Sequence, residues 1–341
     1  MKRRLLIIAD ILLLVVGCLL YETFWAPHSF PGDRFVIVSK GETFSQVIDS
    51  LQKAGVIQSR FFLSLAGRLR GYTTRIQIGK YRFRSGMSNN EVLLDLRYGA
   101  TVEMITVTIP EGMRTTRLAK LLAKDFGIDS SLFMKLVGDS AFIRTLGEGS
   151  GSLEGYLLPN TYTFDWQTEE DRIIREMVNQ FHKTFNDSLK ARARSLGMAV
   201  SQVLALASII EGETSIDSER VLISGVYHNR LKRGMRLQAD PTIQYIIGNG
   251  PRRLVRSDLQ IESAYNTYRH VGLPPGPVNN PGKSAILAAL YPKRHKYLYF
   301  VANGQGGHKF SKTYAEHEHA VRQFRKWREE QDAMKKEKQV M

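Results

Sequence analysis

The sequence SQVLALASIIEGET, residues 201–214, decides how the larger part of the chain folds. Residues 201–210 are apolar or small nearly all round, a pattern that predicts a buried helix capped by Ser201. Glu211 follows two isoleucines, so burial would raise the pKa of its carboxyl group, as a general acid working near neutral pH requires. A helix that merely ends in a solvated glutamate is the plainer interpretation, and periodicity alone favours it.

Glu213 is the nearest rival acid. Successive residues of a helix are turned by about 100°, so Glu213 would point roughly 200° away from Glu211 if the helix continued. The two carboxylates would then not face one substrate, unless Gly212 ends the helix. We therefore expect Glu213 to be a supporting or structural carboxylate.

Three downstream segments combine polar and aromatic side chains with prolines: RLQADPT at 236–242, AYNTY at 264–268 and GLPPGPVNNPG at 272–282. Proline stiffens such loops, polar side chains bind hydroxyl groups, and flat rings pack against sugars. This pattern is typical of a carbohydrate groove and favours the catalytic interpretation of Glu211. For Asp240, which precedes Pro241, the alternative is a residue that only sets a turn.

Near the amino terminus, residues 5–20 are almost continuously apolar. The basic residues 2–4 precede this run, and Tyr21, Phe24 and Trp25 follow it. The pattern predicts a single membrane-spanning anchor whose basic flank stays in the cytoplasm while the rest of the chain is exported.

A cleaved signal peptide and a lipoprotein signal ending at Cys18 are the alternatives for this segment. Both require the apolar run to stop at the cleavage site, yet Leu19 and Leu20 extend it and no small-x-small site follows. Asp10 lies near the cytoplasmic end, where it approaches the interface. We therefore expect an uncleaved anchor within residues 1–26.

The next segment, residues 34–100, reads as a small unit of short strands and helices. Its expected elements are strands at 35–38 and 81–83, helices that start after Thr43 and near Phe61, and a helix opened by a capping box of Ser88 and Glu91. The same spacing of apolar residues returns 71 residues downstream, from Gly41 to Gly112 (112 minus 41), which predicts an imperfect internal repeat.

Further along the chain, residues 105–109 alternate as a strand does, and residues 298–301 and 308–310 predict a hairpin. A basic amphipathic helix beyond Tyr314 presents an apolar stripe that we expect to pack on the catalytic region. Together these patterns predict a mixed α+β fold with one amino-terminal transmembrane helix.

Composition limits the number of domains and the classes of binding site that we expect. A chain of 341 residues with 43% hydrophobic and 24% charged residues is long enough for two or three domains. Its net charge of +15 suits either a solvated surface or a polyanionic partner, and without alternating basic and aromatic residues it does not predict nucleic-acid binding. Cys18 is the only cysteine and the histidines are not clustered, so we expect neither a disulfide, a metal site nor a cofactor.

Several motifs, in the same order along the chain, resemble those of a known protein family. ASIIEGET at 207–214, LQADPT at 237–242, YNTY at 265–268 and GLPPG at 272–276 closely resemble the membrane-bound endolytic murein transglycosylase family, also described as YceG-like. The resemblance covers nearly the whole chain, including the anchor, a LysM-like subdomain, EGYLLPNTY at 154–162 and YLYFVA at 297–302. Asn160 departs from the family pattern, where an aspartate is common.

The resemblance implies four parts: a cytoplasmic start and anchor at 1–26, a LysM-like subdomain at 34–100, a catalytic domain at 101–330 and a basic tail at 331–341. It places the protein in the bacterial cytoplasmic (inner) membrane as a single-pass protein, with the catalytic domain on the periplasmic or extracytoplasmic side. Glycan strands of peptidoglycan and the membrane are the implied partners, with peptidoglycan synthases beside them.

The implied reaction is that of a lyase. The bond from muramic acid to N-acetylglucosamine is cleaved inside the strand, and the muramyl 6-hydroxyl attacks its own anomeric carbon to leave a 1,6-anhydro end, which would terminate elongation of a nascent strand. Glu211 takes the position of the catalytic acid, without a cofactor. A peptidoglycan-binding scaffold of the wall synthesis machinery, without catalysis, remains the alternative.

The motifs also supply the residues expected to hold the substrate or to fix the loops that do so. They are Glu154, Tyr156, Glu213, Gln238, Asp240, Thr242, Tyr265, Asn266, Thr267, Tyr268 and Asn280.

Overall fold

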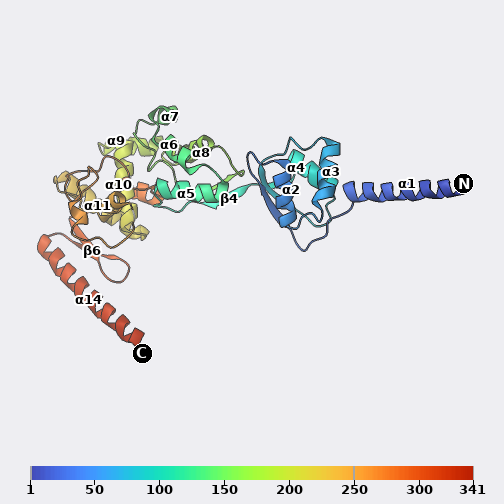
Figure 1. Cartoon of the computed structure of the whole chain (residues 1–341). Helices are drawn as coiled ribbons and strands as arrows, with labels where there is room; N and C mark the ends of the chain where they lie inside the picture. Colours follow the sequence, from blue (N-terminus) through green and yellow to red (C-terminus); the bar gives the residue numbers. More distant parts are fainter. Residues whose placement is uncertain (1, 249, 341) are drawn as a thin grey trace. The chain divides into compact units, whose positions relative to one another are not determined.

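The computed structural model describes residues 2–248 and 250–340 and contains two compact units (Figure 1). The first unit comprises the residues up to 107 together with 122–128 and 162–169, and the second comprises 108–121, 129–161 and the residues from 170 onward. Both units mix helices with short strands. The expected α+β class is therefore confirmed.

Helix α1 (Lys2–Phe24) opens the first unit. Its segment Arg3–Phe24 is long and apolar enough to cross a membrane, and none of its apolar window is buried in the protein. Only its end is tied to the unit, where Thr23 is buried and Asn89 Nδ2 donates a hydrogen bond of 3.2 Å to the carbonyl of Glu22. Helix α1 is thus a candidate membrane span joined to a folded domain.

A three-stranded antiparallel sheet forms the centre of the first unit. Its strands are β1 (Arg34–Val38), β2 (Gly79–Phe83) and β3 (Val102–Glu103), in that order. The helices of this unit that share the apolar core with the sheet are α2 (Phe44–Lys53), α3 (Arg60–Arg70) and α4 (Asn89–Tyr98). Thr43 with Gln46 and Ser88 with Glu91 form capping boxes, so both expected caps are confirmed.

The expected repeat is confirmed in the order of the elements. Strand β1 and helices α2 and α3 are followed, about 71 residues later, by β4 (Ile105–Thr108), α5 (Thr115–Phe126) and α6 (Ser130–Gly138). Gly41 and Gly112 also have matching left-handed backbones, with φ of +86° and +72°. The elements that follow are α7 (Ser140–Thr145), β5 (Thr161–Phe164), which pairs with β4, and α8 (Glu170–Thr184).

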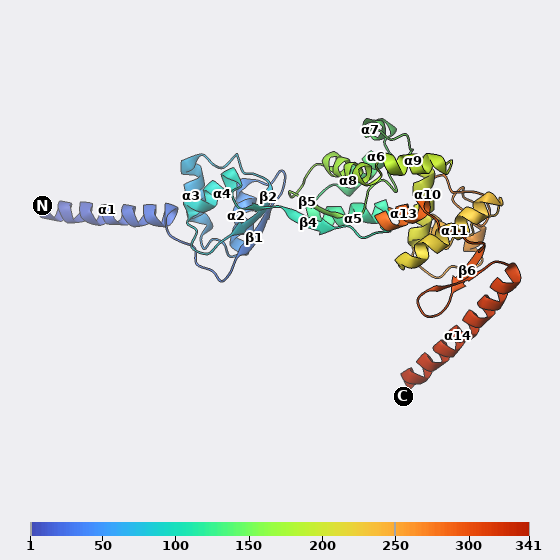
Figure 2. The ribbon, with the colours of Figure 1, turned by 180° about the vertical axis from the view of Figure 1, so that it is seen from behind.

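Helix α10 (Val200–Glu213) lies at the centre of the second unit, with residues 203–210 fully buried. It packs most extensively against α13 (Lys283–Leu290), as Figure 2 shows. The other helices in contact with it are α9 (Asp187–Ser195), α11 (Asp217–Lys232) and α12 (Asp240–Ile247). The apolar sequence therefore forms a helix that is covered on all sides.

The start of α10 differs from the expectation, and its end decides a point that the sequence left open. The helix begins at Val200 after Ala199, whose N–H donates a hydrogen bond of 2.9 Å to the side chain of Gln202, so Ser201 is not its cap. The prediction was wrong because the helix begins two residues earlier, where the side chain of Gln202 accepts the hydrogen bond from the N-cap residue Ala199. The helix also continues through Gly212, which places Glu211 in its last turn.

The carboxy-terminal elements follow the expected order. Strands β6 (Tyr299–Ala302) and β7 (His308–Ser311) form the antiparallel hairpin, and α14 (Tyr314–Val340) packs against it. Ala320 on the apolar stripe of α14 is buried. A short 3-10 helix, η1 (Asp258–Gln260), precedes this region in the loop after α12.

Candidate active site

Glu211 lies between a positive side chain and the start of another helix. Its Oε1 accepts a hydrogen bond of 2.8 Å from Arg220 Nη2, and its Oε2 accepts one of 2.9 Å from the N–H of Gly282. Gly282 is the N-cap residue of α13, so the carboxylate faces the positive end of that helix. With its side chain 6% exposed, Glu211 is not a solvated helix end.

Burial raises the pKa of Glu211, and this is the largest influence on it. The Gly282 hydrogen bond and the charge of Arg220 oppose the rise, whereas the charges of Glu111 and Asp217 add to it. The carboxyl group thus has an increased affinity for a proton, while Arg220 and the Gly282 N–H can stabilise its anion. Such a group can give a proton and then take one back.

The loop after β4, which carries Glu111, passes close to Glu211. The Gly112 N–H donates to the carbonyl of Asn280 at 2.9 Å, and the Asn280 N–H donates to that of Met113 at 3.1 Å. Gly112 has a left-handed φ of +72°, and a Cβ built on it would lie 3.3 Å from Cγ of Glu211. Glycine at this position therefore allows the loop to pass close to the acid.

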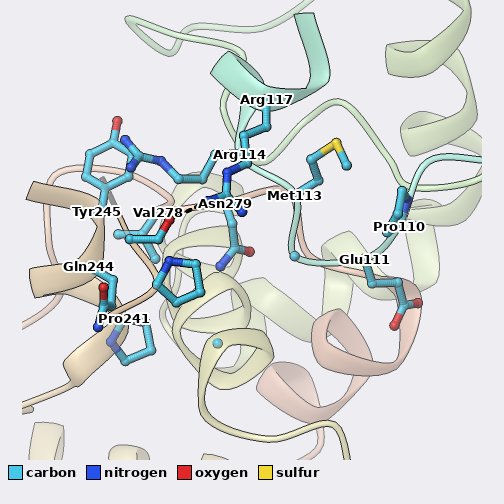
Figure 3. A pocket seen from close by; sticks show the side chains of 14 residues that line it. Pro110, Glu111, Met113, Arg114, Arg117, Pro241, Gln244, Tyr245, Val278 and Asn279 are labelled. Atoms are coloured by element: carbon cyan, nitrogen blue, oxygen red, sulfur yellow. Dashed lines mark hydrogen bonds between the residues drawn. The ribbon is translucent and has the colours of Figure 1, made fainter. Parts of the chain in front are cut away.

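A cavity of about 390 Å³, which we name the first cavity, opens beside this loop (Figure 3). The guanidinium of Arg114 lies over the ring of Tyr245 there, 4.6 Å from its centroid. The cavity is lined by residues 110–114, Arg117, Gly212, Pro241, Gln244, Tyr245, residues 250–251, Val278 and Asn279. The ring of Tyr245, prolines and hydrogen-bonding groups thus face one space.

Asn279 is a lining residue that the sequence reasoning missed. Its Nδ2 donates a hydrogen bond of 2.8 Å to the carbonyl of Ser208, which fixes the orientation of the amide. Its Oδ1 is buried and has no hydrogen-bond partner among the described residues. Ser208 also accepts a hydrogen bond of 2.9 Å from the Val278 N–H, so α10 holds this part of the cavity wall directly. The sequence motif at 272–282 identified this loop. It did not show that Asn279, rather than Asn280, lines the cavity.

Asn280 and Glu154 form a buried network behind the wall. Glu154 Oε1 accepts from the Thr115 N–H at 2.9 Å, and Asn280 donates to the Thr115 hydroxyl at 3.1 Å. Asn280 Oδ1 accepts from the Gly155 N–H at 2.8 Å. Burial raises the pKa of Glu154. Both side chains are committed to protein partners, so their place in this structure is to fix loops.

Four of the expected residues meet at a second cavity of about 490 Å³, which Glu213, Gln238, Asp240 and Tyr268 help to line. Glu213 Oε1 accepts a hydrogen bond of 2.6 Å from the Tyr227 hydroxyl, and burial raises the pKa of Glu213 to about 7. The Tyr268 hydroxyl donates to Asp240. Gln238 has a φ of +50°, a strained conformation for a residue other than glycine.

The remaining expected residues divide between wall and scaffold. The ring of Tyr265 lies 4.8 Å from that of Tyr245 at the first cavity. The buried scaffold residues, whose side chains bond to or pack on the protein itself, are Tyr156, Thr242, Asn266 and Thr267. Among the described residues, no three His, Cys, Asp or Glu side chains are grouped so that they would hold a metal ion.

The fold and site define a mixed α+β protein with a desolvated glutamate, Glu211, whose neighbour Gly212 lines the first cavity. Among the described residues, one helix is long and apolar enough to span a membrane. The model of the YceG-like family matches residues 36–323, and the chain belongs to that family.

Curated relatives carry a common name. The chain is 32% identical over 302 residues to the endolytic murein transglycosylase of Bacillus subtilis strain 168, covering 84% of this chain and 83% of the relative. It is 31% identical over 296 residues to the protein of that name from Streptococcus pneumoniae strain D39, covering 78% of this chain and 53% of the relative. The chain therefore spans about half the length of the pneumococcal protein.

A solved structure supports the same fold. The crystal structure of a yceG-like protein from Listeria monocytogenes superposes with a TM-score of 0.62 at 31% sequence identity. The match covers 84% of this chain and 98% of the Listeria chain.

Proposed function

We propose that this chain is a lytic transglycosylase that cleaves the β-1,4 bond between N-acetylmuramic acid and N-acetylglucosamine within peptidoglycan strands. The observation that carries the proposal is Glu211, a buried acid with a raised pKa beside an open polar and aromatic cavity. The names of the relatives indicate the substrate, peptidoglycan, and the endolytic position of the cut.

In the proposed reaction, Glu211 acts first as an acid and then as a base. Its proton passes to the glycosidic oxygen as the bond to the muramyl anomeric carbon breaks. The resulting carboxylate, held by Arg220 and the Gly282 N–H, accepts the proton of the muramyl 6-hydroxyl as that oxygen bonds to the anomeric carbon. The products are a 1,6-anhydro end and a free hydroxyl, and no water is consumed.

We assign substrate contacts to both cavities. Tyr245 offers a flat face at the first cavity, where a sugar ring packs against aromatic carbon, and the ring of Tyr265 supports it at 4.8 Å. At the second cavity, Gln238, Asp240 and Tyr268 supply acceptors and donors for the hydroxyl groups of a further sugar unit.

The other parts of the proposal concern location. Helix α1 is assigned as the single-pass anchor, within residues 1–26, in the bacterial cytoplasmic membrane. Residues 34–100 are assigned as a LysM-like glycan-holding subdomain, residues 101–330 as a catalytic domain outside the cytoplasm and residues 331–341 as a basic tail. Cutting of nascent strands beside peptidoglycan synthases would then terminate their elongation.

Replacement of Glu211 by glutamine tests the proposal, because it keeps the shape of the side chain and removes the transferable proton. We expect purified Glu211→Gln protein to release no anhydro-ended fragments from glycan strands, as measured by mass spectrometry. Glu318→Gln, an exposed exchange on α14, is the matched control and should cut normally.

Three outcomes would contradict the proposal. Undiminished cutting by Glu211→Gln would remove Glu211 from the reaction. Products with reducing ends would indicate hydrolysis. Binding of strands by the unaltered chain without new ends would favour the non-catalytic scaffold.

A further inference from the structure

Three carboxylates share one buried guanidinium beside the first cavity. Arg220 Nη2 lies 2.8 Å from Oε1 of Glu211 and 3.5 Å from Oε2 of Glu111. Arg220 Nη1 lies 2.6 Å from Oδ1 of Asp217. Because one nitrogen contacts both glutamates, their nearest oxygens are at most 6.3 Å apart (2.8 plus 3.5).

Gly282 holds the two glutamates at the same helix end. Its N–H donates to Glu211, and a side chain at this position would overlap the carboxylate of Glu111. The carboxylate of Glu111 therefore lies against the backbone at the start of α13. Glu111 also lines the first cavity. The loop after β4 and the loop before α13 thus bring Glu111 close to Glu211.

We propose that Glu111 is a positioning carboxylate whose charge keeps the exchangeable proton on Glu211 until the substrate takes it. The inference rests on the proposed function, in which Glu211 must start protonated. If all three carboxylates were ionised, one guanidinium would face three negative charges. Binding one proton relieves this excess.

Burial decides which carboxylate takes the proton. The side chain of Glu211 is 6% exposed, that of Glu111 46% and that of Asp217 77%. A charge is least stable where water is excluded, so the proton shared among these acids belongs on Glu211. The charged groups acting on Glu211 are then Arg220 and Asp217 from α11 and Glu111 from the loop after β4.

The same arrangement suits the second half of the reaction. Once Glu211 has given its proton to the glycosidic oxygen, Arg220 and the Gly282 N–H hold its carboxylate in place. The proton returns from the 6-hydroxyl of the muramyl unit. In this scheme Glu111 acts only through its negative charge.

The pH dependence of cutting tests this role. The alkaline limb of kcat/KM reports the pKa of the acid in the free enzyme, which is Glu211 in the proposed reaction. Glu111→Gln removes a negative charge near Glu211, so the positive charge of Arg220 stabilises the Glu211 carboxylate more strongly. The limb should therefore move to lower pH by on the order of half to one unit. On the alkaline side kcat/KM should fall by about three- to tenfold, and the loss should shrink toward acidic pH.

Two matched variants sharpen the measurement. Glu111→Asp keeps the negative charge, so its alkaline limb should lie close to that of the unaltered chain. Asp217→Asn removes a charge that contacts the same guanidinium from a more solvated position, so its shift should be smaller. Because Glu111 is half exposed, its exchange leaves no buried cavity, and thermal melting verifies the fold of each variant.

Two results would overturn the inference: an unmoved limb in Glu111→Gln, or an equal loss at every pH with a raised KM, which would mean that Glu111 binds the strand itself. Failure of the proposed function would give a different experimental result. It would appear as cutting by Glu211→Gln, whatever the pH profile of the Glu111 variants.

Discussion

Glu211 and Glu213 are two residues apart on α10, yet the fold gives them different surroundings. Glu211 meets Arg220 and a helix start, whereas Glu213 meets the hydroxyl of Tyr227 at the second cavity. The expectation that both would not face one site follows from the helical turn, because the helix continues through Gly212. Each carboxyl is desolvated, but only Glu211 has a cation in direct contact.

Glu213 gives a pH-dependent stability prediction. Burial raises its pKa from 4.5 to about 7, so the folded state binds this proton more tightly than the unfolded state does. The resulting stabilisation is fully present below pH 4.5 and is lost as the pH rises through 7. Its size is up to about 3 kcal/mol, and less where water enters the cavity. Calorimetric melting at pH 4.5, 6 and 8 should show a larger loss in the unaltered chain than in Glu213→Gln, where Glu211 and Glu154, whose pKa values burial also raises, still contribute.

The exposed Glu318 provides the comparison for that experiment. Glu318→Gln should melt in parallel with the unaltered chain at all three pH values. Parallel curves for Glu213→Gln as well would show that its carboxyl ionises in the fold as it does in water.

At the scale of the element, α10 positions the cavity wall through one buried serine. Ser208 Oγ donates to the carbonyl of Ala205 at 2.8 Å and accepts from the Val278 N–H at 2.9 Å. The wall segment is thereby attached to the helix one turn before Glu211. A buried hydroxyl of this kind is not distinguishable in the sequence from a serine that only fills space.

Ser208→Ala should destabilise the fold by about 1–3 kcal/mol, because it leaves the buried N–H of Val278 without a partner. Ser201→Ala on the same helix is the matched control, since Ser201 is not the cap and should change stability by no more than about 0.5 kcal/mol. Denaturation by urea measures both values. A loss in Ser201→Ala as large as in Ser208→Ala would contradict the assignment of the two serines.

At the scale of the whole chain, α1 combines a free apolar surface with a buried end. Its apolar window has no contact that buries it, while Thr23 is 2% exposed and Phe24 packs against the core of the first unit. The boundary between the candidate span and the folded unit therefore lies before Thr23.

Two truncations test this boundary. Removal of residues 2–20 should release the chain from membranes into the soluble fraction and leave the melting temperature of the first unit nearly unchanged. Removal of residues 2–26 also deletes the buried Thr23 and Phe24, so it should lower that temperature. Retention of the shorter truncation in washed membranes would show that α1 is not the anchor.

The sequence by itself determined the local elements. The two capping boxes, the hairpin before α14 and the apolar character of α10 were predictable because each depends on residues within a few positions of one another. It also singled out Glu211, but only because the motifs around that residue resemble one family, since periodicity alone favours a solvated helix end.

Only the tertiary structure decided which groups act on that acid. Arg220, Glu111 and Gly282 come from three separate segments, and their contacts with Glu211 depend on how the loops cross α10. The same holds for Asn279 and Asn280, which are adjacent in sequence but face a cavity and a buried network respectively. The physical reason is that burial and charge pairing are set by distances in space, whereas the sequence fixes only distances along the chain.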